Sequence, residues 1–378
     1  MKYNSGYPFF FKKDVNYILK EFRNILMGKG TLRMGKFVEK FEKNFAKSVG
    51  TKKAISTTSC TAALETILNS LNLKSNEEVI IPCQTYIASA STILRAGGKP
   101  IIAEIDKEFN LDFNDMKKKI TKKTKAVVIV HFGGKISKNI FLIKRHLKKK
   151  KIILIEDAAH GLGASFRNKY AGSIGDIAAF SFYSTKIITT GEGGMISTNN
   201  LSLATKCEKF RSRGMKLNSN VEIYDSLGTN FRMTEVQALL GLTQLTNLKK
   251  FIKYRNTIAS IYNKNLNHLA ITNIITLPSF DKIHTNAFWR YIVVLRKDIN
   301  RKKVLLDLKK YSIDVIHSYD PLIHKQPLIK NLYGKSKKMI FSESYCKQHI
   351  MLPIHYNIKK NDAIFISKIL INSINSKL

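Results

Sequence analysis

The chain has 378 residues, 44% of them hydrophobic and 10% aromatic, which is enough apolar material for a large domain and a smaller one and excludes an intrinsically disordered protein. Lysine and arginine (64 residues) outnumber aspartate and glutamate (27), so the formal net charge is +37. Because the lysines cluster in segments expected to be solvated, we interpret this excess as surface composition and predict no dedicated nucleic-acid or membrane partner. A basic polyanion binder is the alternative.

The four cysteines argue against two kinds of small stabilised domain. They form no Cys-x-x-Cys pair and no dense framework, so we expect neither a zinc site nor a disulfide scaffold, and a reducing cytoplasm fits. The apolar burst at residues 7–11 is too short for a signal peptide, and no run approaches the roughly 18 apolar residues of a membrane helix. We therefore expect a cytoplasmic protein.

Short apolar runs rich in β-branched residues alternate with helix-like amphipathic stretches over residues 50–200. Strands that are apolar along their whole length bury both faces, so this alternation predicts an α/β domain with a mainly parallel sheet covered by helices. The predicted strands are 53–57, 79–81, 100–103, 126–130, 152–155, 177–180 and 195–197.

The pattern changes after residue 245. A long helix is predicted over residues 245–266 and a strand over 288–294, followed by mixed elements. We therefore predict a large domain at residues 1–245, which includes the N-terminal segment, and a smaller C-terminal α+β domain at residues 246–378.

Lys186 is the first candidate for chemistry. It follows the predicted strand 177–180 in a weakly charged segment, and a glycine-rich turn at 189–194 comes after it. Burial destabilises the charged form of a lysine, so its amine becomes a nucleophile that can form a Schiff base. The alternative is an ordinary surface lysine in a lysine-rich chain.

Asp157 and His160 follow the predicted strand 152–155, in a segment too apolar to solvate a charge. A buried carboxylate needs a cationic or hydrogen-bonding partner, and a protonated pyridine nitrogen meets that need. The alternatives are a helix N-cap for Asp157 and a metal site. For a metal site no third ligand has a suitable spacing, so we predict none.

Ser59, Cys60 and Thr61 follow the predicted strand 53–57 and open a helix. The free N–H groups and the positive end of a helix suit a phosphate, and Ser181 is another polar side chain at the end of a strand. Plain N-capping by Ser59 or Thr61 is the alternative and is compatible with phosphate binding.

Several segments, taken in order, resemble the DegT/DnrJ/StrS family of sugar aminotransferases, a branch of the fold-type I pyridoxal-phosphate enzymes. The resemblance covers nearly the whole chain and implies a fold-type I transferase with a large cofactor-binding domain and a smaller C-terminal domain. The matching segments are 35–42, 58–64, 82–86, 156–160 (Glu-Asp-Ala-Ala-His), 171–176 (Ala-Gly-Ser-Ile-Gly-Asp), 181–194 and 230–238.

The resemblance implies a role for each residue near the cofactor ring. Lys186 would hold pyridoxal 5'-phosphate as a Schiff base and then move the proton between the cofactor and the substrate carbon. Asp157 would pair with the pyridine nitrogen, and His160 would lie near the phenolic oxygen. Tyr86 would stack on the ring, with a core tyrosine as the alternative.

The resemblance also implies contacts around the ring. Ser59, Cys60, Thr61 and Ser181 would hold the phosphate, and Cys60 stands where the family most often has glycine. Asn230 is similar to the residue that reaches the phosphate from the neighbouring subunit, which implies a homodimer.

Two further segments would border the substrate. His324 lies in residues 317–327, which resemble the family's His-rich loop at the sugar site, and exposed loop histidines are the alternative. The loop 131–135 differs from its usual form in the family and is expected on the substrate side.

The implied reaction is a transamination. An amino group would pass from an amino acid, expected to be glutamate, through pyridoxamine phosphate to a keto sugar, in this family most often a nucleotide-linked 4-keto-6-deoxyhexose. Such a reaction serves amino-sugar and surface-polysaccharide biosynthesis. A dehydratase branch of the family replaces the Schiff-base lysine by histidine, so Lys186 argues against that alternative.

Overall fold

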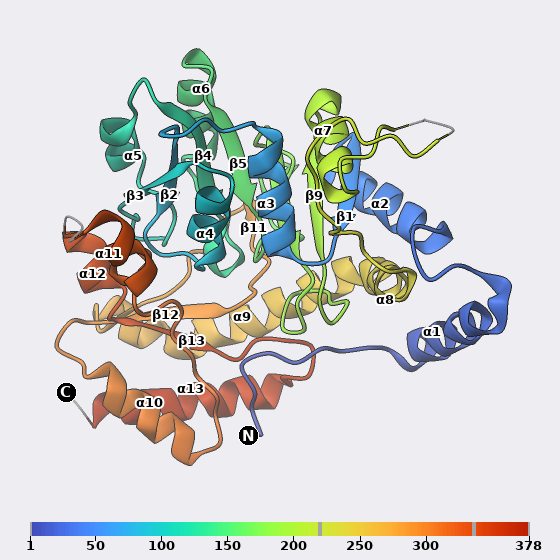
Figure 1. Cartoon of the computed structure of the whole chain (residues 1–378). Coiled ribbons are helices and arrows are strands. Elements are labelled where there is room, and N and C mark those ends of the chain that lie inside the picture. The colour runs from blue at the N-terminus through green and yellow to red at the C-terminus, as the bar shows by residue number, and fades with distance from the viewer. Residues whose placement is uncertain (1, 218–220, 335–337, 377–378) are drawn as a thin grey trace.

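A seven-stranded sheet forms the centre of the larger part of the molecule (Figure 1). The computed structural model describes residues 2–217, 221–334 and 338–376. The strand order is β1-β9-β8-β5-β4-β2-β3, and neighbouring strands are parallel except in the two pairs that β9 makes. Each predicted strand segment belongs to this sheet, so the expected mainly parallel mixed sheet is confirmed. The strands are β1 Lys53–Thr57, β2 Glu78–Pro82, β3 Lys99–Ala103, β4 Thr124–Val130, β5 Ile153–Asp157, β8 Ile177–Ser181 and β9 Gly194–Thr198.

Helices cover both faces of the sheet. In β2, Ile80 packs into the core on one face, whereas Val79 and Ile81 pack into the core on the other. Successive side chains of a strand point to opposite faces, which is why a strand between two helix layers is apolar throughout. The first face is covered by α2 Lys36–Val49, α5 Phe113–Lys119, α6 Ile140–Lys149 and α8 Glu235–Thr246, and the second by α3 Cys60–Ser70, α4 Ala88–Arg95 and α7 Leu201–Arg211.

Polar side chains fix where the helices near the strand ends begin. The Ser59 hydroxyl accepts a hydrogen bond of 3.0 Å from the Ala62 N–H at the start of α3. Thr234 and Gln237 form a capping box at the start of α8. The Glu235 carboxylate accepts N–H groups from the first turn of α2. Each contact satisfies donors that a helix leaves unpaired at its N-terminus.

A second, smaller core surrounds a three-stranded antiparallel sheet in the order β10-β12-β13. Three helices pack into this core, and Figure 1 shows this part below the large sheet. The mixture of antiparallel strands and helices is the α+β arrangement expected for the C-terminal part. Its elements are β10 Ile275–Thr276, β12 Tyr291–Leu295, β13 His349–Leu352, α9 Leu248–Ile271, α10 Arg301–Lys310 and α13 Lys360–Asn375.

The helix predicted over residues 245–266 is α9, which starts after α8 has ended. Asn247 is both the C-cap residue of α8 and the N-cap residue of α9. Phe251 in α9 packs into the larger core, whereas Ile258 and Tyr262 pack into the smaller one. Because one helix joins both cores, the division at residue 245 stays a prediction.

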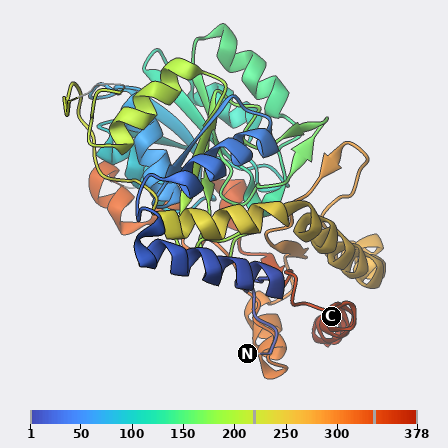
Figure 2. The same cartoon turned by 90° about the vertical axis from the view of Figure 1, so that its right-hand side faces the viewer.

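The N-terminal segment crosses from the smaller core to the larger one. Tyr3 pairs with Ile313 and belongs to the smaller core. Further along, α1 (Lys12–Asn24) lies alongside α8, as the dark blue and yellow helices of Figure 2 show. Within the described residues no helix combines the length and apolarity needed to cross a membrane.

Shorter elements complete the described chain. A small sheet has the order β11-β6-β7. Two short helices lie between α10 and β13 in sequence, and Figure 1 shows them beside the edge strand β3. These elements are β6 Ser165–Phe166, β7 Lys169–Tyr170, β11 His284–Thr285, α11 Pro327–Tyr333 and α12 Ile340–Tyr345, with a π-helical turn at Ile25–Lys29 and 3₁₀ turns at Phe132–Gly134 and Ile323–Lys325.

Candidate active site

A cavity of about 540 Å³ lies where strands of the large sheet end and β12 of the smaller part begins. A larger open groove of about 1080 Å³ runs along α8 and α9, but none of the predicted site residues lines it. The smaller cavity holds the chemistry, since polar groups from several strand ends converge there. The predicted residues that line it are Ser59, Cys60, Thr61, Tyr86, Asp157, His160, Ser181 and Lys186.

Lys186 lies in the loop after β8, and the indole of Trp289 holds this loop in place. The Trp289 Nε1–H donates a hydrogen bond of 3.1 Å to the Thr185 carbonyl, and the Lys186 ammonium lies 4.3 Å from the centre of the indole ring. Burial lowers the pKa of Lys186 to about 8, although the nearby Cys60 and Asp157 oppose this shift. About one tenth of the amine is therefore neutral and nucleophilic at pH 7, far more than for a lysine with its usual pKa.

Asp157 is the last residue of β5 and is 5% exposed. Its Oδ1 accepts the Ala159 N–H at 3.1 Å and its Oδ2 accepts the Ser89 hydroxyl at 3.2 Å. Burial raises the pKa of the carboxyl group, and the backbone N–H of Ala159 and the charge of Lys186 counter that effect. A turn follows Asp157, so it caps no helix, and a protonated pyridine nitrogen fits beside this buried carboxylate.

The start of α3 forms an anion site beside β8. The first N–H groups of a helix have no intrahelical acceptor, and they face the cavity together with Ser181. Cys60 does not have a positive φ, so a side chain is tolerated where the family most often has glycine. Gly194 is required instead, because a Cβ atom there would lie 2.3 Å from the Ser59 carbonyl oxygen. A phosphate group fits this position.

His160 and Tyr86 line the cavity in different ways. The His160 ring stacks on Trp289 at 3.6 Å between ring centres, and its Nε2 lies 3.3 Å from the Tyr319 hydroxyl. Burial, with the charges of Lys186 and Arg290, lowers the pKa of His160 well below its usual value, so the imidazole is neutral. Tyr86 is 55% exposed, which excludes a core tyrosine and leaves its ring available for stacking.

Among the cavity residues that were not predicted as site residues are Trp289, Arg290 and Tyr319. They come from the C-terminal part, and their positions depend on how that part packs against the sheet. Trp289 is the only tryptophan of the chain, and it stands next to an arginine at the start of an apolar strand. That unusual pair of residues is the sequence signal that could have indicated a site there.

Two predicted residues do not line this cavity in the single chain. His324 is 1% exposed and bonds to the Glu343 carboxylate at 2.9 Å, and its expected contact with a sugar stays a prediction. Tyr319, from the same segment 317–327, reaches the cavity instead. Asn230 is exposed on the surface, where its side-chain oxygen accepts a 3.0 Å hydrogen bond from Arg232.

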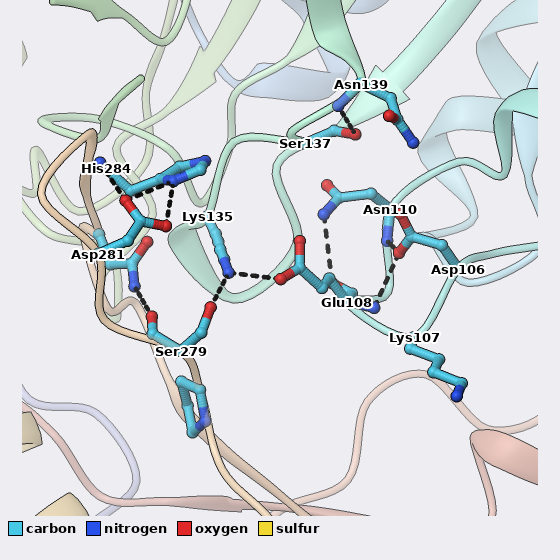
Figure 3. Close-up of polar contacts among 12 residues, drawn as sticks. Asp106, Lys107, Glu108, Asn110, Lys135, Ser137, Asn139, Ser279, Asp281 and His284 are labelled. Atoms are coloured by element: carbon cyan, nitrogen blue, oxygen red, sulfur yellow. Dashed lines mark hydrogen bonds and ion pairs between the residues drawn. The ribbon is translucent and has the colours of Figure 1, made fainter. Parts of the chain in front are cut away.

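The loop 131–135 contacts residues near the strand ends but does not line the cavity. His131 bonds to the buried Glu156 carboxylate at 2.7 Å, and Glu156 also accepts the Gly172 N–H at 2.8 Å. Lys135 bridges Glu108 and Ser279, at 2.6 Å each, as Figure 3 shows. None of the residues 131–135 lines the cavity, so the loop acts on it only through neighbouring residues.

Comparisons with known proteins place the chain among aminotransferases. Residues 13–370 match the DegT/DnrJ/EryC1/StrS aminotransferase family. The chain is 35% identical over 332 residues to GDP-perosamine synthase of Caulobacter vibrioides, covering 87% of this chain and 88% of that protein. It is 33% identical over 333 residues to GDP-perosamine synthase of Escherichia coli O157:H7, covering 88% of each. PseC of Helicobacter pylori, an aminotransferase involved in pseudoaminic acid biosynthesis, has the same fold, with a TM-score of 0.90, 27% identity and 100% of both chains covered.

The family match, the fold and the cavity lead to one conclusion. The resemblance expected from the sequence is confirmed over nearly the whole chain, and so is the fold-type I architecture. The cavity provides a partly buried lysine, a buried carboxylate and an anion site, which fit a phosphate-bearing pyridine aldehyde. The chain therefore belongs to the DegT/DnrJ/EryC1/StrS family of pyridoxal-phosphate-dependent sugar aminotransferases.

Proposed function

We propose that this enzyme transfers an amino group from glutamate to a nucleotide-linked 4-keto-6-deoxyhexose. The observation that carries the proposal is that Lys186 and Asp157 share one cavity and influence each other's charge. Three relatives that are 32–35% identical are named GDP-perosamine synthase, so a GDP-linked keto sugar is the first acceptor to test. The basic surface would help to collect a nucleotide diphosphate.

We assign the cofactor contacts from the residues that line the cavity. When bound, pyridoxal phosphate supplies an electron sink for the carbon that loses or gains a proton. Asp157 would hold the pyridine nitrogen protonated, and Tyr86 would lie on the ring. The neutral His160 would accept or donate a hydrogen bond at the phenolic oxygen. The phosphate would be held by Ser59, Cys60, Thr61 and Ser181.

Lys186 would carry the proton in both halves of the reaction. Its pKa of about 8 places it close to physiological pH, where one group can both take and give a proton. The Trp289 indole and the bond to the Thr185 carbonyl hold the lysine loop in position. Lys186 would first hold the cofactor covalently and then act as general base and acid.

The active site would be completed by a second copy of the chain. Exposed apolar side chains gather on α1 and on residues 221–227, with Leu19 60% exposed and Leu227 91% exposed. Such surfaces mark interaction sites in soluble proteins. Asn230 adjoins the second of these segments, and we propose that it reaches the partner's phosphate site.

Mixing two inactive variants tests the Asn230 proposal. Lys186→Ala and Asn230→Ala dimers are dissociated, mixed and reassociated. A mixed dimer then has one site with both residues intact, so about one quarter of wild-type activity returns, since half of randomly paired dimers are mixed. No recovery, with mixed dimers verified by mass, would show that Asn230 acts within its own chain.

The reaction itself is tested with purified enzyme, glutamate and a panel of GDP-, dTDP- and UDP-linked keto sugars. Mass spectrometry and NMR should find a product with one amino group in place of the keto oxygen, together with 2-oxoglutarate. Loss of water without gain of nitrogen would support the dehydratase alternative. Salt-sensitive DNA binding that persists in Lys186→Ala, with no turnover of any sugar, would support the polyanion-binding alternative.

A further inference from the structure

The Arg290 guanidinium lines the cavity beside Lys186 with most of its hydrogen-bonding capacity unused. Arg290 is 3% exposed, its Nη1 donates a 3.2 Å bond to the Trp289 carbonyl, and its Nε has no partner among the described residues. Over the same part of the chain, no carboxylate oxygen lies within 4.0 Å of its nitrogens. A guanidinium has five N–H donors, so several are left for a ligand.

The other two buried arginines of the described chain have a carboxylate or two backbone carbonyls as acceptors within the protein, although the Nε of Arg211 also lacks a partner. Arg211 pairs with Glu42 at 2.7 Å, and Arg255 donates to the Phe288 carbonyl at 2.9 Å and to a second backbone carbonyl. The cation in the neighbouring loop, Lys135, is also paired, as Figure 3 shows. Burying a charge without a partner is costly, so the unpaired Arg290 indicates a site that a ligand completes.

Two neighbours hold the guanidinium in place. It lies 4.3 Å from the centre of the Trp289 ring, and the N-terminal segment passes over it at Gly6. A Cβ atom at Gly6 would lie 2.9 Å from Nη1 of Arg290, so a side chain at this position would displace the guanidinium. The segment is fastened where the Ser5 N–H donates to Asp314 at 2.9 Å. A guanidinium held in this way is preorganised for a planar anion.

We propose that Arg290 binds the α-carboxylate of the amino donor. The inference rests on the proposed transamination, in which the donor's amino group must reach Lys186. The α-carboxylate is attached to the same carbon as that amino group, and the Lys186 and Arg290 cations each lie 4.3 Å from the same indole. Arginine binds carboxylates through two parallel hydrogen bonds. A carboxylate placed beside the negative Asp157 instead would be repelled.

The test follows each half of the reaction separately in Arg290→Gln. With glutamate alone, the rate of the change in the holoenzyme's absorption spectrum should fall by about 100-fold, because hydrogen bonds to a charged group are lost. The second half, from the amine form of the enzyme to the amino sugar, should change by less than about threefold. Lys186 serves both halves, so an indirect effect through Lys186 would slow both equally and would overturn the proposal.

Two controls sharpen the result. Arg296→Gln removes an exposed cation just after β12, paired with Asp298, and should leave both halves unchanged. Arg290→Lys keeps the charge but loses the planar fork, so it should slow the glutamate half by about tenfold. If Arg290→Gln does not fold, the two half-reactions are compared in Arg290→Lys instead.

Two amines decide which carboxylate is bound. L-2-aminobutyrate keeps the α-carboxylate and should lose rate in Arg290→Gln as glutamate does, whereas 4-aminobutyrate lacks it and should react equally with both proteins. Equal losses with both amines would overturn the α-carboxylate assignment. If wild type reacts and Arg290→Gln reacts equally fast with glutamate, only this inference fails. If wild type reacts with no amino acid, the proposed function fails.

Discussion

Replacing Lys186 by alanine is expected to abolish turnover and to remove the covalent link to the cofactor. A positioned general acid and base alone contributes about 10²–10⁴-fold, so activity should fall by roughly 10³-fold or more. The visible absorption of the purified protein should change from that of a lysine-bound cofactor to that of free pyridoxal phosphate. Stopped-flow spectroscopy with glutamate, and a coupled assay for 2-oxoglutarate, measure both effects.

The matched control for this variant is Lys206→Ala, which removes an exposed lysine of α7. It lowers the net charge by the same amount and should leave the absorption and the rate unchanged. If Lys186→Ala kept the lysine-bound spectrum, another lysine would hold the cofactor. The assignment from the cavity would then be wrong.

Replacing Asp157 by asparagine is expected to have the second largest effect. The substitution keeps the shape and removes the buried negative charge, so activity should fall by roughly 10²-fold, as when one preorganised electrostatic contact is lost. The pKa of Lys186 should also fall below its value of about 8, because the negative charge of Asp157 favours the ammonium form. The direction of this shift is fixed by the sign of the charge that is removed.

The pH dependence of cofactor capture by the apoprotein measures this shift. Capture needs the neutral amine, so its rate should rise with pH through about 8 in wild type and through a lower pH in Asp157→Asn. Asp176→Asn is the control: this carboxylate bonds to the Leu154 N–H at the start of β5, at the other end of the strand from Asp157. Asp176→Asn should not change the pH at which the rate of cofactor capture is half of its maximum. A midpoint that moves upward in Asp157→Asn would contradict the proposed coupling.

Much of the fold was predictable because it depends on short-range patterns. Apolar runs such as 126–130 and 152–155 have two buried faces wherever they are placed in a parallel sheet, so they identify strands without knowledge of the strand order. The boundary between α8 and α9 was less predictable. The sequence predicts a helix that begins at residue 245, whereas α8 continues to Thr246 and α9 begins at Leu248, with only Asn247 between them.

Part of the candidate site was likewise predictable from the sequence and part was not. Lys186, Asp157 and the start of α3 follow strands of one sheet, and the carboxyl ends of parallel strands meet at one edge. Their proximity therefore follows from the strand assignment. His324 does not follow a strand end, because its segment 317–327 has no regular pattern; it bonds to Glu343 and does not line the cavity of the single chain, so its role at the sugar site stays a prediction.

The sequence by itself determined the strands, the residues at their ends and, through the recognised segments, the family. The predicted catalytic residues could be found from local sequence patterns, because each of them comes directly after a predicted strand. Only the tertiary structure brought Trp289, Arg290 and Tyr319 to the cavity. They belong to a part of the chain about a hundred residues later than Lys186, and packing between two cores, which no local pattern encodes, sets their distance from it.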